Sequence, residues 1–213
     1  MNIFAKRKGC TYRYARQKWT DFWRRRWAFV PNGSVHSQYA DDDQYIEKDR
    51  TKRTKNYTLL KVGDQKIDRW IKREPCIEAW ASVKYEWAKE RAIYGTDLTS
   101  YLLTDFCMPM IEESLSHIFP VGRNANEWYV QRRVELAGDA GTALCFDYED
   151  FNSQHSMSSM QAVLQAYFDT FRSSMSEEQK EASNWVLQSV WKQTVNCDGE
   201  KYQSAGTLLS GWR

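Results

Sequence analysis

The sequence predicts a mixed α+β protein that is rich in helix, and three stretches carry that prediction. Apolar side chains recur at helical spacing over 160–171, which indicates an amphipathic helix. An uncharged run of small, β-branched and aromatic residues at 142–146 favours a buried strand. The segment 194–202 turns at Asp198-Gly199, which is typical of a β-hairpin. A chain of 213 residues is long enough for one or two modest domains with a substantial core.

Charge is nearly balanced overall, with a formal net charge of +2, but it is distributed unevenly. Residues 1–30 carry a run of lysines and arginines against a single acid, Asp21. Such a block attracts polyanions, of which nucleic acid is the first to consider. A solvated basic face accounts for the same composition equally well.

The five cysteines are scattered, and no Cys-x-x-Cys pair or Cys/His cluster has the spacing of a zinc site. Free thiols in a reducing compartment fit this pattern best. The sequence contains no signal peptide and no apolar run of about 20 residues. We therefore expect a soluble intracellular protein with no membrane partner.

The N-terminal part of the chain predicts a helix, a turn and a polar linker in that order. Aromatic residues recur at helical spacing over 11–30 and indicate an amphipathic helix with a basic side. The stretch 31–36 is a turn by composition, since its Asn-Gly pair tolerates a left-handed backbone. Three adjacent aspartates at 41–43 lie in a hydrophilic stretch, so we expect a solvated linker there and no metal site.

The stretch 84–97 predicts an extended strand with concentrated positive charge. In an extended chain, Lys89, Arg91 and Ile93 share one face. Arginine offers forked donors and lysine a mobile point charge, and this combination suits a triphosphate. A surface strand with ordinary charges is the plainer alternative.

The middle of the chain predicts a helix over 98–119 that kinks or breaks at Pro109. His117 lies near the apolar face of this helix, and we expect it to be a core residue. Residues 121–141 follow as a polar connection that ends in a glycine-rich turn. Farther along, Ser176 is the expected N-cap of a second helix whose first turn is acidic.

The acidic end of the strand at 142–146 is the strongest candidate for a catalytic site. Asp147 stands where the strand would emerge, and Asp150 follows shortly after it. Carboxylates at the end of a buried strand are costly to desolvate unless a partner neutralises them. Mg²⁺ typically binds one or two carboxylates together with substrate phosphates. Asp147 is therefore the expected metal ligand, and Asp150 is either a second ligand or the cap of the following turn.

Several of these stretches match sequence motifs of one protein family, and they occur along the chain in the order in which that family carries them. The stretch 147–156, Asp-x-x-Asp-Phe-Asn-Ser-Gln-His-Ser, resembles motif A of the viral RNA-dependent RNA polymerases, in the form used by totiviruses and related double-stranded RNA viruses. The stretch 84–93, Lys-x-Glu-x-x-Lys-x-Arg-x-Ile, resembles motif F of that family, and Glu86 is expected to pair with one of its basic residues. The Asn-Gly-Ser turn at 32–34 resembles the template-entrance loop, motif G, and the Ser-Gly pair at 210–211 resembles the start of motif B.

The resemblance implies a partial right-hand polymerase with fingers and the first part of a palm. Residues 1–141 would form the fingers region, with the template-entrance loop near 31–36 and the nucleotide-phosphate strand at 84–97. Residues 142–213 would form an incomplete palm with a small antiparallel sheet. That palm would contain motif A at 142–156, two helices, a hairpin, and the start of motif B at 206–213.

The resemblance also implies a role for each motif residue. Asp147 and Asp150 would be catalytic and would hold two Mg²⁺ or Mn²⁺ ions in the complete enzyme. The residues implied in nucleotide binding are Lys84, Lys89, Arg91, Asn152, Ser210 and Gly211. Those implied in template binding are Asn32, Gly33 and Ser34. Many RNA polymerases have aspartate where Asn152 stands, so the chain departs from that pattern at the position near the incoming ribose.

The partners implied by the resemblance are an RNA template and product, ribonucleoside triphosphates, and a viral capsid protein that can be fused to the polymerase in the parent chain. The implied location is the virion interior or the host cytoplasm. The Gly-Asp-Asp hairpin of motif C does not occur in the sequence. We therefore expect the chain to be a fragment of a longer polymerase and to be unable to add nucleotides by itself.

Two other functions remain open at this point. A reverse transcriptase is also a palm polymerase with an acid-terminated strand, although the polar Asn152 stands where such enzymes usually carry an aromatic steric gate. A non-catalytic RNA-binding module would suit the basic N-terminal block, but it gives no role to a buried strand that ends in Asp147.

Overall fold

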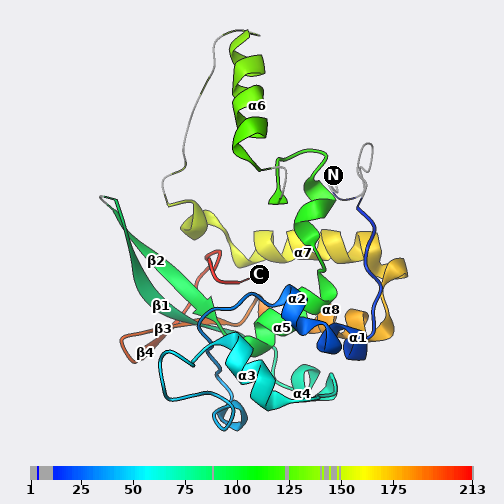
Figure 1. The fold of residues 1–213 in the computed structure, drawn as a ribbon, viewed down its shortest axis with the longest axis vertical. Helices are drawn as coiled ribbons and strands as arrows, with labels where there is room; N and C mark the ends of the chain where they lie inside the picture. The colour runs from blue at the N-terminus through cyan, green and yellow to red at the C-terminus, as the bar shows by residue number, and fades with distance from the viewer. Residues whose placement is uncertain are drawn as a thin grey trace.

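The computed structural model describes residues 4, 12–87, 89–122, 125–139, 141, 144, 148 and 150–212. Helices form one body, a four-stranded sheet lies at one side of it, and one helix extends away from it (Figure 1). The helices are α1 (Trp19–Arg24), α2 (Arg26–Phe29), α3 (Lys55–Val62), α4 (Asp68–Ile71), α5 (Leu98–Cys107), α6 (Glu127–Asp139), α7 (Met157–Phe171) and α8 (Glu177–Ser189). The strands are β1 (Ile77–Glu86), β2 (Lys89–Thr96), β3 (Gln193–Cys197) and β4 (Glu200–Gln203). The α+β class predicted from the sequence is confirmed.

The centre of the helical body is α5, all of whose residues are buried, packed against α8. The carboxylate of Asp97 caps α5 by accepting a hydrogen bond from the amide of Ser100 (2.9 Å). A capping box formed by Ser176 and Gln179 starts α8, at the N-cap that the sequence predicts. The buried Gln179 amide group also donates to the carbonyl of Phe106 (3.1 Å), so the start of α8 is fixed to the end of α5.

The aromatic N-terminal segment packs onto this centre as two short helices. The predicted single helix at 11–30 is wrong in its extent, because α1 begins at Trp19 and the chain bends at Arg25 before α2. Trp19 is fully buried, lies 5.1 Å from the ring of Phe106, and donates its indole N–H to the carbonyl of Gln65 (2.9 Å). The predicted apolar face is thus core, except that Trp27 remains half exposed.

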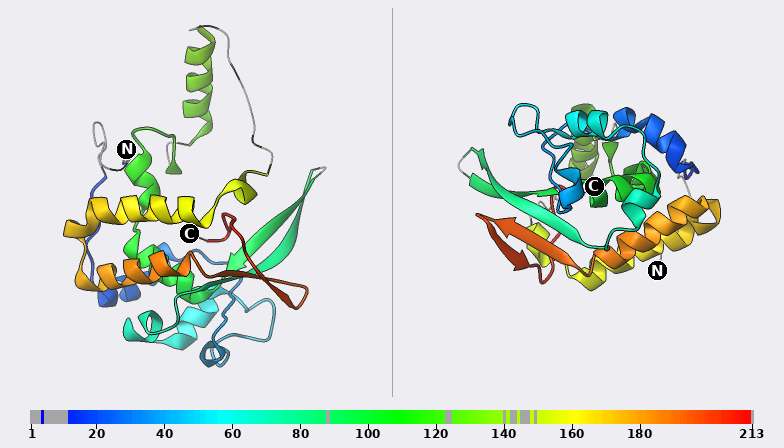
Figure 2. Two further views of the ribbon diagram at one scale, coloured as in Figure 1. Left: turned by 180° about the vertical axis from the view of Figure 1, so that it is seen from behind. Right: turned by 90° about the horizontal axis from the view of Figure 1, so that it is seen from below.

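The sheet has the strand order β2-β1-β3-β4 and is mixed. The β1–β2 and β3–β4 pairs are antiparallel, but β1 and β3 run parallel from Ile77 opposite Gln193 to Trp80 opposite Asn196. The expected small antiparallel sheet is therefore wrong for its central pair. Two parallel strands need a long crossover between them, and the helical segment from α5 to α8 supplies it. Figure 2 shows the two hairpins leaving the helical body side by side.

The basic stretch 84–97 forms a hairpin and not the single strand that we expected. The strand β1 ends at Glu86, and β2 returns from Lys89, so Lys84 lies directly opposite Arg91. The hairpin predicted at Asp198-Gly199 is confirmed, and both residues have the positive φ that such tight turns require.

The segment after α5 differs from the prediction in one place. The helix stops at Cys107, and a 3₁₀ turn follows at Ile111–Leu115, so the predicted break at Pro109 is confirmed. The polar connection expected at 121–141 is wrong, because α6 occupies most of it with none of its residues buried. Asn126 caps this helix by accepting a hydrogen bond from the amide of Tyr129 (2.9 Å).

The expected solvated linker at 41–43 is wrong for its central residue. The Asp42 side chain is buried and lies 2.7 Å from Arg73 and 2.8 Å from Arg69. Burial alone would raise the pKa of Asp42, but hydrogen bonds from Arg73, Ser37 and Arg69 outweigh it and hold that pKa below its usual value. This cluster fastens the linker to α4. Within the part of the chain that the structure describes, no three metal-ligating side chains gather into a site.

The predicted fingers and palm regions share one core. Trp19, Leu102 and Phe106 from the first region belong to the same apolar cluster as Tyr167 and Trp185 from the second. The strand pair β1–β3 also joins the two regions. The boundary near residue 141 stays a prediction. None of the helices in the described ranges is long and apolar enough to cross a membrane.

Candidate active site

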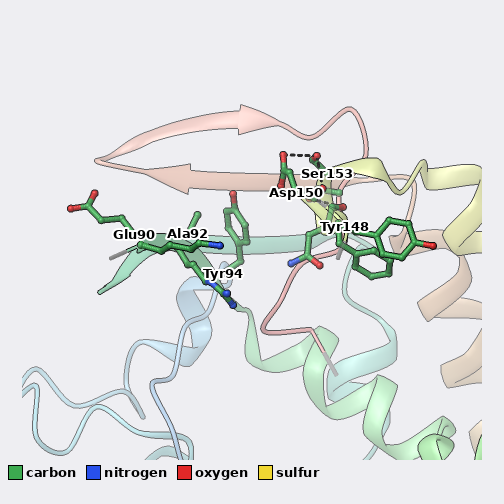
Figure 3. A pocket seen from close by; sticks show the side chains of 11 residues that line it. Glu90, Ala92, Tyr94, Tyr148, Asp150 and Ser153 are labelled. Carbon is green, nitrogen blue, oxygen red and sulfur yellow. Dashed lines mark hydrogen bonds between the residues drawn. The ribbon is translucent and has the colours of Figure 1, made fainter. Parts of the chain in front are cut away.

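A cavity of about 810 Å³ lies between β2 and the segment that leads into α7 (Figure 3). One wall comes from β2 and the other from the motif A stretch, and Figure 3 shows Glu90, Ala92 and Tyr94 across from Tyr148, Asp150 and Ser153. The residues that line it are Lys89, Glu90, Arg91, Ala92, Tyr94, Tyr148, Asp150, Phe151, Asn152, Ser153 and Thr207. Basic and acidic groups that are distant in the sequence therefore face one space.

The basic wall is preorganised by an acid within the same hairpin. Glu86 lies 2.8 Å from Lys84 and 3.0 Å from the Nε atom of Arg91, so the predicted pairing is confirmed, with two partners. The hydrogen bond from Lys84, helped by the charge of Arg91, lowers the pKa of Glu86. Exposed ion pairs of this kind stabilise a fold little. These ion pairs can therefore exchange partners without a large loss of folding stability. Lys89 forms no ion pair with any described residue.

The acidic wall is built on a tight turn. Asp150 has a left-handed backbone (φ 47°), and its carboxylate accepts a hydrogen bond from the hydroxyl of Ser153 (2.6 Å). Asp150 stands at the N-cap position of the 3₁₀ turn Phe151–Gln154 and also lines the cavity, but its carboxylate makes no capping hydrogen bond to a backbone amide of that turn, so its expected role as a cap is not confirmed. Asp147 and most of the strand predicted at 142–146 lie outside the described residues.

Aromatic rings support this turn from behind. The rings of Phe151 and His155 meet edge to face with centroids 4.6 Å apart, and the Nδ1 atom of His155 is 2.9 Å from the carbonyl oxygen of Phe151. The Tyr148 ring lies 5.5 Å from that of Phe151. His155 thus touches the turn without lining the cavity.

Asn152 joins the motif A turn to the C-terminal segment. Its side chain lines the cavity, and its backbone carbonyl accepts hydrogen bonds from the amide of Leu208 (2.9 Å) and the hydroxyl of Thr207 (3.3 Å). Gly206 makes this approach possible, because a Cβ there would lie 2.9 Å from the carbonyl oxygen of His155. The backbone around Asn152 is therefore held on two sides.

The Ser-Gly pair at 210–211 docks on the outer edge of β2. The amide of Tyr94 donates to the hydroxyl of Ser210 (3.1 Å), and the hydroxyl of Thr96 donates to the carbonyl of Gly211 (3.0 Å). A Cβ at Gly211 would lie 1.9 Å from the carbonyl oxygen of Tyr94, so only glycine fits. Neither Ser210 nor Gly211 lines the cavity, and they act here as a brace for the strand that does.

The predicted template-binding turn at 32–34 is separate from the cavity. Ser34 bridges Thr54, and the amide of Lys55 donates to the carbonyl of Gly33 (2.9 Å). Just beyond the turn, the ring of His36 stacks on Trp80 of β1 with centroids 4.9 Å apart. Asn32, Gly33 and Ser34 are thus carried by a loop that is fixed to both α3 and β1.

The structure brings together Lys89, Arg91, Asp150 and Asn152, while Lys84, Ser210 and Gly211 lie next to the same cavity without lining it. Sequence reasoning missed several lining residues, chiefly Tyr94, Tyr148 and Thr207. Tyr148 lies inside the motif A stretch, so its position next to Asp147 could have identified it as a lining residue. Thr207 and Tyr94 carry no local signal, because they reach the cavity through the docking of the C-terminal segment on β2.

Comparison with known proteins supports the resemblance inferred from the motifs. A family model described as viral RNA-directed RNA-polymerase matches residues 3–213. A probable RNA-directed RNA polymerase of Saccharomyces cerevisiae virus L-A is 50% identical over 205 residues, which cover 95% of this chain and 14% of the relative. Its counterpart in Saccharomyces cerevisiae virus L-BC is 38% identical over 220 residues, and these cover 99% of this chain and 14% of the relative. A third probable RNA-directed RNA polymerase, from Leishmania RNA virus 1, is 28% identical over 203 residues.

The chain spans 14% of the length of the two yeast-virus relatives. No solved structure gives a significant match. The family match nevertheless extends over nearly the whole chain, and it includes both walls of the cavity. The chain belongs to the viral RNA-directed RNA polymerase family.

Proposed function

We propose that the complete protein is an RNA-directed RNA polymerase of a totivirus-like double-stranded RNA virus. It transfers ribonucleoside monophosphates from NTPs to an RNA 3′-hydroxyl in genome replication and transcription. One observation carries the proposal: Lys89 and Arg91 line the same cavity as Asp150 and Asn152. Cations suit the triphosphate and carboxylates suit a hard divalent metal, so this cavity is suited to an NTP–metal complex.

The residues of each wall have distinct tasks in this proposal. Lys89 and Arg91 hold the triphosphate, and Lys84 keeps Glu86 occupied so that Arg91 can turn to the phosphates. Asn152 hydrogen-bonds to the 2′-hydroxyl of the incoming ribose and so favours ribonucleotides over deoxyribonucleotides. Ser210 and Gly211 hold β2 in position and contact the nucleotide from beside the cavity.

A divalent metal fits the acidic wall. The Asp150 carboxylate lines the cavity and, among the described residues, accepts a hydrogen bond from Ser153 alone, so it retains lone pairs for a cation. Asp147 and Asp150 would hold two Mg²⁺ or Mn²⁺ ions in the complete enzyme. Such ions supply charge that activates the attacking 3′-hydroxyl and stabilises the leaving pyrophosphate. The left-handed backbone at Asp150 turns its carboxylate toward the cavity side of the turn.

The finer architecture that we propose is a right hand with the fingers in 1–141 and an incomplete palm in 142–213. The parallel pairing of β1 with β3 would then join fingers and palm in one sheet. The proposed partners are an RNA template and product, with Asn32, Gly33 and Ser34 on the template, and a viral capsid protein. The proposed location is the virion interior or the host cytoplasm.

The experiment that tests this function is template-directed NTP incorporation by the complete polymerase, with and without Mg²⁺. Asp147→Asn should abolish incorporation, because amide oxygen replaces a charged metal ligand. Asp43→Asn is the matched control, since Asp43 is exposed and lies outside the cavity, and it should leave the rate unchanged. Full activity of the Asp147 variant, or equal use of dNTPs and NTPs by the wild-type enzyme, would contradict the proposal.

The two alternative functions have less support. Each of the three relatives described above is named a probable RNA-directed RNA polymerase, and none a reverse transcriptase or a capsid-associated RNA-binding protein. A non-catalytic module also has no need for an acidic wall opposite Lys89 and Arg91.

A further inference from the structure

We propose that Trp27 and Tyr57 form a stacking site for one unpaired base of a single-stranded RNA template, beside the template-entrance loop. This inference rests on the proposed function, which places a template RNA on the template-entrance loop. It assigns that RNA strand a second contact beside the loop. The site is a surface pocket of about 340 Å³ lined by Trp27, Asn56, Tyr57 and Leu60. Pockets for small ligands typically measure about 300–1,000 Å³.

The pocket is apolar and open. Trp27 and Tyr57 are each 45% exposed and Leu60 is 67% exposed, so large apolar surfaces remain in contact with water. A folded protein leaves such groups gathered at the surface mainly where something binds. Aromatic rings accept any base through its π-face, which is how proteins bind single-stranded nucleic acid without reading its sequence.

Trp27 is held in position by a buried cation. The guanidinium of Arg26 lies 4.4 Å from the Trp27 ring centroid and 4.7 Å from that of Trp23. Arg26 is almost fully buried and donates hydrogen bonds to the carbonyls of Trp23 (2.6 Å) and Leu59 (3.3 Å). These contacts join α2 to α3, so one wall of the pocket is fixed relative to the other before any ligand arrives. Preorganised aromatic groups bind with little loss of conformational entropy.

The other wall is fixed by the start of α3. The hydroxyl of Thr54 caps this helix by accepting from the amide of Tyr57 (3.4 Å). Asn56 contributes an amide side chain whose Oδ1 atom is buried and has no hydrogen-bond partner among the described residues. A buried amide oxygen without a partner is unfavourable. A base edge that enters the pocket brings the donors that could satisfy it.

The pocket adjoins the loop that the motifs assign to the template. Ser34 forms an isolated antiparallel β-bridge with Thr54, and the amide of Lys55 donates to the carbonyl of Gly33 (2.9 Å). The loop and the start of α3 therefore form one surface. Arg24 ends α1 and Arg25 immediately precedes α2, and the ammonium group of Lys55 lies beside Gly33 of the loop, which gives the neighbourhood a positive charge. An RNA strand on the loop therefore has favourable charge on its path and an aromatic pocket within the same surface. A peptide segment would use the apolar rings but would gain nothing from this charge.

The test is equilibrium binding of a labelled single-stranded RNA to the complete polymerase, without NTPs, at several salt concentrations. Trp27→Ala and Tyr57→Ala should each weaken binding by about 5-fold or more, because loss of one base–aromatic stack has that size. The slope of log K against log salt should stay as in the wild type, since no phosphate contact is lost. Trp27→Phe should retain most of the affinity. Trp191→Ala removes an equally exposed tryptophan outside the pocket and should change nothing.

Crosslinking and competition measurements then show whether RNA occupies the pocket. Ultraviolet crosslinking of the same RNA should attach nucleotides to the peptides that carry Trp27 or Tyr57, and an excess of a free mononucleotide should not prevent it. Unchanged affinity in both alanine variants overturns the proposal. So does a Trp27→Ala protein with lower thermal stability, unchanged RNA affinity and no crosslink, which would mean that another protein segment fills the pocket. Failure of NTP incorporation by the wild-type enzyme would reject the proposed function. The RNA-binding and crosslinking measurements need no catalysis, so they test the pocket separately.

Discussion

The two halves of β1 differ in almost every physical respect. Ile77 and Ala79 are fully buried, and this half pairs with β3 from Ile77 to Trp80 and also with β2 from Ala79 onward. Beyond Trp80 the strand pairs with β2 alone, and the side chains from Val83 onward are mostly exposed. The inner half is therefore anchored in the core, while the outer half is a two-stranded projection whose stability comes mainly from its hydrogen bonds.

The difference separates folding from function along one strand. The charged hairpin residues that line the proposed substrate cavity, Lys89, Glu90 and Arg91, lie on β2 opposite the outer half of β1, where water and ligands reach them. The residues that hold the fold lie on the inner half and behind it. Regions of low local stability are where binding elements are usually found. Four substitutions test this division, from the largest expected effect to the smallest.

Arg73 stands just before β1 on the buried side, and it should be the most sensitive of the four positions. Its side chain is 8% exposed, lies 2.7 Å from Asp42, and also donates to the hydroxyl of Thr99 (2.6 Å). Arg73→Ala should lower the free energy of unfolding by about 3 kcal/mol, because it leaves the buried Asp42 carboxylate with fewer partners. Urea denaturation of the purified protein measures this loss. Arg132→Ala, on the exposed helix α6, is the control and should change stability by less than about 0.5 kcal/mol.

Arg91 is the counterpart on the exposed side, with a side chain that is 60% exposed. Arg91→Ala should leave urea denaturation unchanged and reduce kcat/KM for NTP by roughly 10- to 150-fold, since a charge-assisted hydrogen bond to phosphate contributes about 1.5–3 kcal/mol. Steady-state incorporation by the complete polymerase measures the effect. Arg91→Lys keeps the positive charge but loses the forked guanidinium donors, so its kcat/KM should fall between those of the wild type and Arg91→Ala. An Arg91→Ala protein that loses stability but retains activity would show that Arg91 holds the fold and does not bind the substrate.

The contrast between Arg73 and Arg91 also shows what the sequence can and cannot predict. The roles proposed for Lys89 and Arg91 come from a short local pattern, and so does the pairing of Glu86, whose ion pairs are found as expected. The Asp42–Arg73 cluster joins residues far apart in the chain. Three adjacent aspartates in a polar stretch look the same whether or not a distant arginine buries one of them.

Local patterns located the long helices that bury one face, but they gave no helix at α3 or α4. The stripe at 160–171 and the cap at Ser176 describe α7 and α8 well, because those helices bury one face. The helix α6 was missed, since its apolar residues, among them Val130, Val134 and Leu136, are all exposed and mark no single buried face. The parallel β1–β3 pairing could not be read either, because strand direction depends on the path of the intervening helices.

Gly211 tests whether the docked C-terminal segment supports the base of the hairpin, where Tyr94 and Thr96 pair with β1. Gly211→Ala places a Cβ 1.9 Å from the carbonyl oxygen of Tyr94, so the segment must move away from β2. We expect a loss of about 1–3 kcal/mol in the free energy of unfolding, the usual cost of overpacking. The amides of β2 that Ser210 and its neighbours cover should then exchange hydrogen faster. Gly138→Ala meets nothing within 4 Å and should be neutral or slightly stabilising. Equal effects of the two alanines would show that the segment does not brace β2.

His36 lies at the junction of the two halves, where its ring stacks on Trp80 and fills the space left by Gly95. Burial, with the nearby charges of Arg53 and Lys55, lowers the pKa of His36 to about 4. The unfolded chain, in which histidine has a pKa near 6.5, therefore binds more protons than the folded chain between about pH 4 and pH 6.5. The stabilisation is fully present above pH 6.5 and is lost as the pH falls through this window. His36→Phe keeps a ring against Trp80 and removes the titration, so its unfolding free energy should vary less with pH over that range than that of the wild type. Urea titrations at several pH values measure both slopes, and identical slopes would show that His36 is protonated as easily in the folded protein as in the unfolded chain.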